Sequence, residues 1–136
     1  MVKTAPVMTT WINLAMVALG GAAGSLARYL LTLAALAIPG GSTMLGTTVS
    51  NVIGCAAIGA FAEYVIANEH LSEASQLGIR VGLLGGLTTF STFAFESVAL
   101  AELGRWGGSV IYVLANLVLG CLALLIATTM VRGWMS

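Results

Sequence analysis

The chain has 136 residues, of which 59% are hydrophobic and 7% are charged, and its mean hydropathy is +1.02. A soluble domain carries about 25% charged residues, and a chain this short has too little interior to hide so much apolar surface from water. Five basic and five acidic residues give a formal net charge of zero, which argues against a basic surface for nucleic acid. Composition therefore predicts an integral membrane protein.

Four apolar stretches are each long enough to cross a bilayer as a helix, which requires about 20 residues. We expect spans at about residues 11–37, 45–67, 76–103 and 107–131. The segments between them are rich in glycine, proline or polar residues, which end helices. The sequence therefore predicts an all-α protein whose 136 residues form a single membrane domain, with both termini on one side.

Lysine and arginine are divided almost evenly between the two predicted sides of the membrane. Lys3, Arg80 and Arg132 belong to the side of the termini, and Arg28 and Arg105 belong to the other. Positive charge in short loops normally fixes the orientation of a membrane protein. So small a difference is compatible with insertion in both orientations, and hence with an antiparallel homodimer.

Glycines recur at intervals of four residues in two of the predicted spans. Gly20 and Gly24 lie in the first span, and Gly78, Gly82 and Gly86 lie in the third. Small residues at this spacing allow helix backbones to approach closely in lipid. We therefore expect tight helix–helix contacts through these positions.

The two cysteines, Cys55 and Cys121, both lie inside apolar runs. The one histidine, His70, is far from both in sequence, and no metal-ligand spacing is present. We expect both cysteines to be small packing residues.

Residues 85–93 form the densest polar cluster, with the sequence Gly-Gly-Leu-Thr-Thr-Phe-Ser-Thr-Phe. Glycine weakens a helix, and serine and threonine bond to nearby backbone instead. One interpretation is a break in the third helix near the bilayer midplane, where irregular backbone is tolerated only inside protein or beside an aqueous cavity. The other is an intact helix whose hydroxyls bond to their own carbonyls, and composition leaves both open.

Aromatic and amide side chains lie on predicted helix faces close to this cluster. Phe90 and Phe93 are three residues apart, and Tyr112 and Asn116 are four apart, so each pair shares a face. The positive edges of aromatic rings suit an anion path, although phenylalanines at this spacing also commonly face lipid. Asn51 in the second span either presents its amide hydrogens to such a path or bonds two helices together.

Three segments of the chain together resemble the Fluc (CrcB) family of fluoride channels. The resemblance runs from about residue 12 to residue 132. Its motifs are residues 85–93 followed by Glu96 in the third span, residues 20–29 in the first, and residues 46–47 with Asn51 and Gly54 in the second.

The resemblance implies an antiparallel, dual-topology homodimer with two fluoride pores, which exports fluoride passively across the bacterial cytoplasmic membrane. The implied partners are fluoride, membrane lipid and a second copy of the chain. No nucleophile–base pair or metal-ligand cluster suggests catalysis, so we do not expect an enzyme.

The resemblance also assigns residues to the path. Asn51 corresponds to the pore asparagine that donates to fluoride, and Thr47 to a hydroxyl near the path. Phe90 and Phe93 correspond to the two phenylalanines whose ring edges flank it. The fourth-span face departs from the family, which commonly has hydroxyls there. In this chain it carries Tyr112, Asn116 and Gly120, of which Asn116 can replace a hydroxyl as a donor and Gly120 cannot.

Four further residues are assigned by the same resemblance. Gly85 and Thr88 correspond to positions whose backbone carbonyls hold a structural sodium ion (Na+) at the dimer centre. Two antiparallel copies would supply four carbonyls to one cation. Arg28 corresponds to a vestibule arginine, and Glu96 to an acid that affects conductance.

Two other classes of membrane protein fit the size of the chain. A small four-span, proton-coupled multidrug exporter needs a carboxylate near the middle of span one, where this chain has Asn13 and no acid. An accessory membrane subunit would use the glycine packing but would leave the polar cluster of the third span unexplained.

Overall fold

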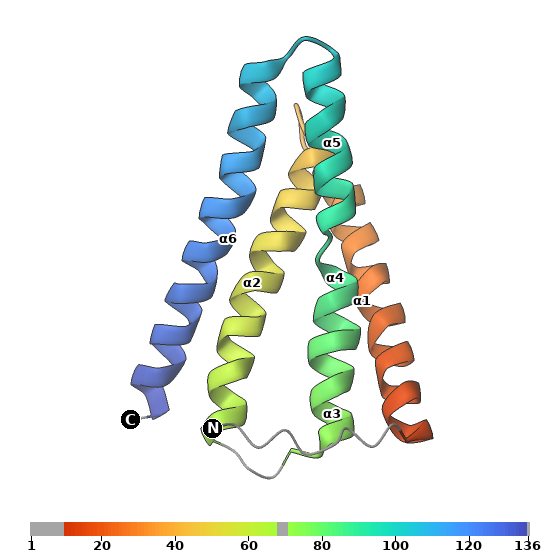
Figure 1. Cartoon of the computed structure of the whole chain (residues 1–136), viewed down its shortest axis with the longest axis vertical. Helices are drawn as coiled ribbons and strands as arrows, with labels where there is room; N and C mark the ends of the chain where they lie inside the picture. The colour runs from red at the N-terminus through yellow and green to blue at the C-terminus, as the bar shows by residue number, and fades with distance from the viewer. Residues whose placement is uncertain (1–9, 68–70, 136) are drawn as a thin grey trace.

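The chain folds into four long helical rods that run alternately up and down, as Figure 1 shows. This computed structural model describes residues 10–67 and 71–135, so Lys3 and His70 lie outside the described residues. The first, second and fourth rods are single helices: α1 (Trp11–Ala37), α2 (Thr43–Ala67) and α6 (Trp106–Met135). The third rod consists of four consecutive segments: α3 (Glu73–Leu77), η1 (Gly78–Leu84), α4 (Gly85–Leu87) and α5 (Phe90–Glu102). All four are long and apolar enough to cross a membrane, which confirms the predicted all-α, four-span architecture.

Most differences between the predicted and observed bounds come from polar residues that cap or extend the helices. The second rod begins at Thr43, two residues before its predicted start, and Ser42 Oγ accepts a hydrogen bond from the Leu45 N–H at 3.2 Å. The third rod begins at Glu73, where the Ser72 hydroxyl caps the first turn. An apolar run defines the buried part of a helix but not its capping residues, so hydropathy places these starts too late.

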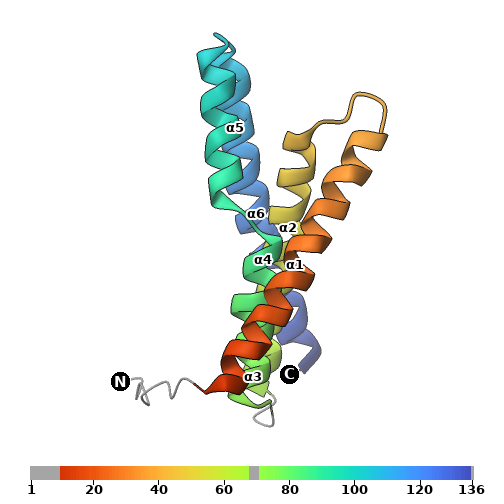
Figure 2. The same cartoon turned by 90° about the vertical axis from the view of Figure 1, so that its right-hand side faces the viewer.

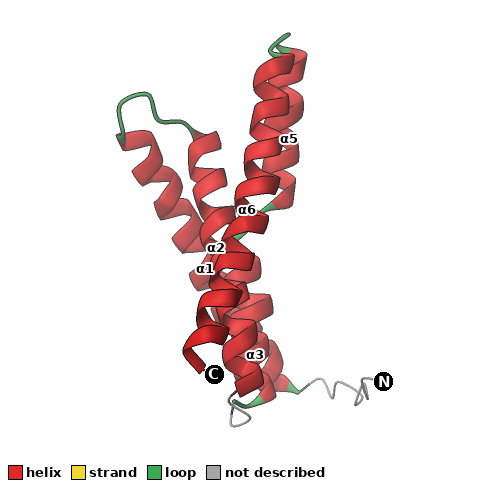
Figure 3. Cartoon of the chain, turned by 90° about the vertical axis from the view of Figure 1, so that its left-hand side faces the viewer, coloured by secondary structure: helices red, strands yellow, loops and turns green. Residues whose placement is uncertain are grey.

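The rods form two arms that diverge toward one end of the molecule, as Figures 2 and 3 show. In the half nearest the termini, α1 packs against α3, η1 and α4, and α2 packs against α6. In the other half, α1 and α2 form one arm while α5 and α6 form the other. We call the space at the base of the two arms the fork.

Glycines bring the backbones of α1 and the third rod into direct contact. A Cβ atom at Gly20 would collide with the Gly78 carbonyl oxygen, and one at Gly24 would collide with the Leu83 carbonyl oxygen. From the other side, a Cβ at Gly82 would come within 2.7 Å of the Val17 carbonyl oxygen. The close approach predicted from the glycine spacing is confirmed.

The segment η1 is π-helical, which the sequence analysis did not anticipate. It covers seven residues, Gly78–Leu84, in the part of the third rod that packs on α1. Most π-helical turns in proteins are short and lie near functional sites. Here the segment leads directly to α4 and the polar cluster.

An ion pair joins α2 to α6 at the end of the molecule where the described chain begins and ends. Arg132 Nη2 lies 2.6 Å from Glu63 Oε1, and Arg132 Nε lies 3.3 Å from Glu63 Oε2. The Arg132 side chain is exposed, so we expect salt to screen this pair strongly.

The glycine contact between α1 and the third rod is directly testable. We expect Gly24→Ala to lower the free energy of unfolding by about 1–3 kcal/mol, because the new methyl group is forced into main-chain atoms that cannot move aside. The measurement is a denaturant titration in detergent micelles followed by tryptophan fluorescence.

Gly107→Ala provides the matched control. No atom lies within 4 Å of a Cβ built at Gly107, which lies in the first turn of α6. Its stability should stay within about 1 kcal/mol of wild type. Equal stability of the two variants would show that α1 and the third rod do not depend on backbone contact.

Candidate functional site

The helical backbone of the third rod is interrupted at two threonines. Thr88 (φ −84°, ψ 155°) and Thr89 (φ −149°, ψ 119°) are both extended. The last backbone hydrogen bond before them runs from the Thr88 N–H to the Leu84 carbonyl at 3.0 Å. The Thr89 hydroxyl then accepts from the Thr92 N–H at 3.2 Å and caps α5.

This interruption removes the helical hydrogen-bond donors of several carbonyl groups, among them those of Gly85 and Thr88. In a continuous helix, the N–H groups of Thr89 and Thr92 would bond to the carbonyls of Gly85 and Thr88. Instead they donate to Asn51 Oδ1 and to the Thr89 hydroxyl. Among the described residues, no other group donates to these two carbonyls, so they have free lone pairs for a cation or a partner's donor.

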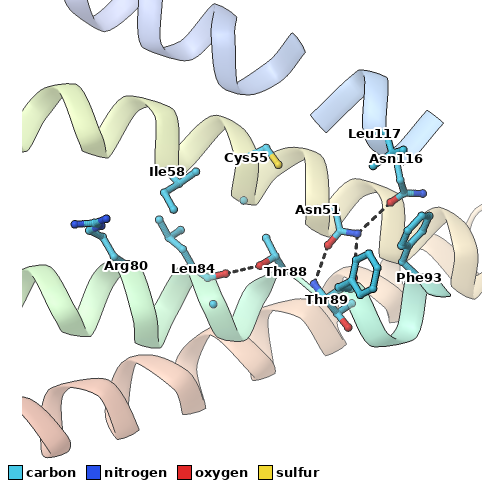
Figure 4. A pocket seen from close by; sticks show the side chains of 13 residues that line it. Asn51, Cys55, Ile58, Arg80, Leu84, Thr88, Thr89, Phe93, Asn116 and Leu117 are labelled. Carbon is cyan, nitrogen blue, oxygen red and sulfur yellow. Dashed lines mark hydrogen bonds between the residues drawn. The ribbon is translucent and has the colours of Figure 1, made fainter. Parts of the chain in front are cut away.

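Asn51 replaces the missing helical bonds of Thr89, as Figure 4 shows. Its Oδ1 accepts from the Thr89 N–H at 2.8 Å, and its Nδ2 donates to the Thr89 carbonyl at 3.2 Å. The same Nδ2 donates to Asn116 Oδ1 at 3.0 Å. Asn116 Nδ2 in turn donates to Thr48 Oγ1 at 3.0 Å and to the Tyr112 carbonyl at 3.1 Å. These bonds join α2, the third rod and α6 at the level of the interruption.

A row of aromatic rings extends from this network along α5. The rings of Phe90 and Phe93 meet edge to face, with centroids 5.7 Å apart and an interplanar angle of 61°. Phe93 also contacts Tyr112, with centroids 5.6 Å apart. The two phenylalanines differ in exposure, since Phe93 is 7% exposed and Phe90 is 77% exposed. Only Phe93 is therefore held inside the subunit.

A pocket of about 370 Å³ brings together many of the residues predicted for the path. We call it the amide pocket. Its lining includes Asn51, Phe90, Phe93 and Asn116, together with Gly85 and Thr88 of the predicted sodium site. Arg80 also lines it (Figure 4) and supplies positive charge to a wall that is otherwise neutral.

A second pocket, of about 250 Å³, lies at the fork and is lined by Arg28 and six hydroxyl residues. The hydroxyls come from α1, from α2, from the interruption and from the first turn of α5, and belong to Ser25, Tyr29, Thr32, Thr47, Thr89 and Thr92. Among the described residues, Arg28 has no ion-pair partner. Thr47 and Arg28 thus lie apart from the amide pocket, and Thr89 lines both.

Glu96 lines neither pocket and contacts the network through α6. The Tyr112 hydroxyl donates to Glu96 Oε2 at 2.6 Å. Tyr112 itself is buried beneath Phe93. Glu96 is therefore linked to the amide pocket only indirectly, through Tyr112 and the Phe93 ring that Tyr112 contacts.

Three residues of the site were not singled out by the sequence analysis. Thr89 received no role, although threonine is among the residues preferred at the first capping position of a helix. Thr48 and Ser50 carry no such signal. Thr48 accepts from Asn116, whereas the Ser50 hydroxyl is fully buried and has no hydrogen-bond partner among the described residues.

Cys55 agrees with the packing role that was expected of both cysteines, whereas Cys121 is exposed. Cys55 and Cys121 are free thiols, and Cys55 Sγ lies 3.2 Å from where a Cβ at Gly120 would be. Within residues 10–67 and 71–135, no three histidine, cysteine or acidic side chains group as metal ligands.

Comparisons with known proteins agree with the resemblance. A sequence profile of the family described as "CrcB-like protein, Camphor Resistance (CrcB)" matches residues 15–128. A protein of Agrobacterium fabrum named "Fluoride-specific ion channel FluC" is 40% identical, over 82% of this chain and 90% of its own length. Proteins with the same name from Anaeromyxobacter dehalogenans (38% identical, 91% and 98%) and Rhodopirellula baltica (34% identical, 95% and 100%) are also similar. The chain belongs to the CrcB family.

Proposed function

We propose that this protein is a fluoride-selective channel that exports fluoride passively across the bacterial cytoplasmic membrane. Its relatives are named as fluoride-specific channels. The observation that carries the proposal is the amide pocket, in which two asparagines and two phenylalanines lie beside an interrupted membrane helix. Such an interruption is tolerated within a span only where protein or an aqueous path surrounds it.

The residue types in the amide pocket suit a small, strongly hydrated anion. A pore must replace the ion's water with hydrogen-bond donors and still bind the ion weakly enough to release it. Asn51 carries amide donors, the Asn116 side-chain oxygen accepts one of their hydrogens, and the edges of Phe90 and Phe93 carry partial positive charge. None of these four groups is an ion, so fluoride can move on once it has bound. Chloride is larger and a poorer acceptor, and it gains less from the same donors.

Passive export needs no coupling machinery. Fluoride enters cells as its uncharged acid and dissociates inside, and the membrane potential then drives the anion outward. A proton-coupled exporter has no support in α1 (Trp11–Ala37), which contains no acidic residue. We therefore assign no enzymatic or coupled step to the chain.

We also propose that two copies form an antiparallel, dual-topology homodimer with two pores. Polar groups at the interruption support this, because Ser91 and Thr92 are exposed and the carbonyls of Gly85 and Thr88 lack donors among the described residues. Polar groups at this depth are costly in lipid and need protein around them. A second copy across the fork would cover them, and the small charge bias permits both orientations.

The carbonyls of Gly85 and Thr88 fit a structural sodium ion shared by the two copies. Their usual donors are diverted to Asn51 and to the Thr89 hydroxyl, and unwound backbone carbonyls are typical sodium ligands in membrane proteins. A bound sodium ion would supply a fixed positive charge beside the path.

Flux measurements test the proposed function. Liposomes that contain the purified protein should release loaded fluoride rapidly, as followed with a fluoride electrode, and should release little chloride. Protein-free liposomes serve as the control. Retention of fluoride by vesicles that contain well-folded protein would refute the channel function.

A comparison of the two most exposed phenylalanines of α5 tests whether the Phe90 ring belongs to the pore. Phe90 lines the amide pocket at 77% exposure, whereas Phe95, at 74% exposure, does not line it. Phe90→Ala should reduce fluoride flux by about two- to tenfold, because a specific aromatic contact is worth about 0.5–1.5 kcal/mol. Phe95→Ala should conduct like wild type. Similar flux from both variants would exclude a role for the Phe90 ring edge.

The dimer and its sodium ion have separate tests. The variant Trp106→Cys places a thiol at the end of the molecule opposite the termini. If both orientations are present, an impermeant thiol reagent should label roughly half of the molecules from each side of the membrane. Cys55→Ala and Cys121→Ala in the same chain remove the native thiols. Labelling from one side alone would rule out dual topology.

The thermal midpoint of the dimer should fall when choline replaces sodium, and an unchanged midpoint would argue against the ion.

A further inference from the structure

We propose that Asn116 is a positioning residue that occupies an amide hydrogen of Asn51, and that an anion enters the amide pocket by displacing the Asn116 side-chain oxygen. The inference rests on the proposed function, because it concerns how the pocket admits an anion. It is carried by the direction of each hydrogen bond in the network of Figure 4.

The orientation of the Asn51 amide follows from Thr89. The Thr89 backbone N–H can only donate, so the Asn51 atom 2.8 Å from it is the oxygen Oδ1. Asn51 Nδ2 carries two hydrogens, and acceptors lie 3.2 Å away (the Thr89 carbonyl) and 3.0 Å away (Asn116 Oδ1). Both amide hydrogens of Asn51 are therefore already bonded inside the subunit.

The orientation of Asn116 is fixed from the opposite end of the network. The Tyr112 carbonyl can only accept, and it lies 3.1 Å from Asn116 Nδ2. Thr48 Oγ1 accepts the second hydrogen at 3.0 Å and gives its own hydrogen to the Met44 carbonyl at 2.9 Å. The reversed amide would place its oxygen against a carbonyl, so Asn116 presents Oδ1 to Asn51.

Four of these bonds consequently form a chain that runs in one direction, from the Thr89 N–H to the Met44 carbonyl. An anion beside Asn51 finds no spare hydrogen on either amide and has to replace an acceptor. The Thr89 carbonyl belongs to the main chain, whereas Asn116 Oδ1 belongs to a side chain that can turn between rotamers. Asn116 is therefore the acceptor that yields to the anion.

The resemblance to the family assigns Asn51 as the donor to fluoride but does not say what holds that donor beforehand. In this chain the occupant is an amide on α6, at a position where the family commonly has a hydroxyl. An amide oxygen competes directly with the ion for the Asn51 hydrogen. The chain should therefore bind fluoride more weakly than it would without this competitor.

Asn116→Leu in the full-length protein tests this competition. Leucine is similar to asparagine in size but cannot accept a hydrogen bond, so one Asn51 hydrogen becomes available to fluoride. In planar bilayers, we expect the fluoride concentration at half-maximal unitary current to fall by about tenfold. The maximal current should fall as well, because a more tightly bound ion leaves more slowly.

Val118→Ala is the matched control. Val118 lies two residues after Asn116 on α6, its side chain is apolar and exposed, and it lines neither the amide pocket nor the pocket at the fork. Its half-saturating concentration should equal that of wild type. In an Asn51→Ala background, Asn116→Leu should have no further effect on that concentration. An unchanged half-saturating concentration in Asn116→Leu, or an equal shift in both backgrounds, would overturn the inference.

A structural measurement separates this inference from the proposed function. Side-chain amide hydrogens of Asn51 and Asn116 should exchange slowly with solvent, as followed by nuclear magnetic resonance of ¹⁵N-labelled protein. Thr48→Val keeps the shape of the side chain but removes the acceptor of Asn116, and should speed exchange at Asn116. Rapid exchange in the wild type would overturn the inference. These results do not require conduction, so the two failures are distinguishable even if Asn116→Leu does not fold.

Discussion

The structure depends on one constraint, which is that backbone polar groups inside a membrane must find partners within the protein. An unbroken helix is the simplest way to meet this constraint, but the third rod is interrupted at Thr88 and Thr89. One side chain from α2 replaces part of the lost backbone bonding, because Asn51 forms hydrogen bonds with both the N–H and the carbonyl of Thr89. Carbonyls that remain without donors among the described residues, those of Gly85 and Thr88, are the groups on which the proposed sodium site is built.

The two halves of the third rod are held by different neighbours. The half before the interruption is fixed against α1 through glycines that leave no room for side chains. The half after it is tied to α6, where the Tyr112 hydroxyl bonds to Glu96 and the Ser109 hydroxyl bonds to the Ser97 carbonyl at 2.7 Å. Asn51 lies where these supports meet. The arms can therefore diverge at the fork without leaving the interruption unsupported.

How much was predictable depended on the range of the interaction. Spans and glycine contacts follow from local composition and spacing, because lipid allows few ways to bury a helix. The Asn51–Asn116 bond joins residues 65 positions apart, and its geometry depends on how α2 and α6 are rotated about their axes. Apolar periodicity does not fix that rotation when a helix is hydrophobic all round. The unequal exposure of Phe90 and Phe93 was unpredictable for a similar reason, since it depends on how α5 turns after the interruption.

Because the segment η1 is π-helical, the number of residues that it contains matters for the structure that follows it. A π turn contains more residues than an α turn for nearly the same rise. The loss of one residue within Gly78–Leu84 can therefore be absorbed by a return to α-helical geometry, with little rotation of the residues that follow. The same loss from a stretch that is already α-helical cannot be absorbed in this way and rotates everything after it by about 100°. Single-residue differences in length among natural variants of the third rod should therefore fall within η1.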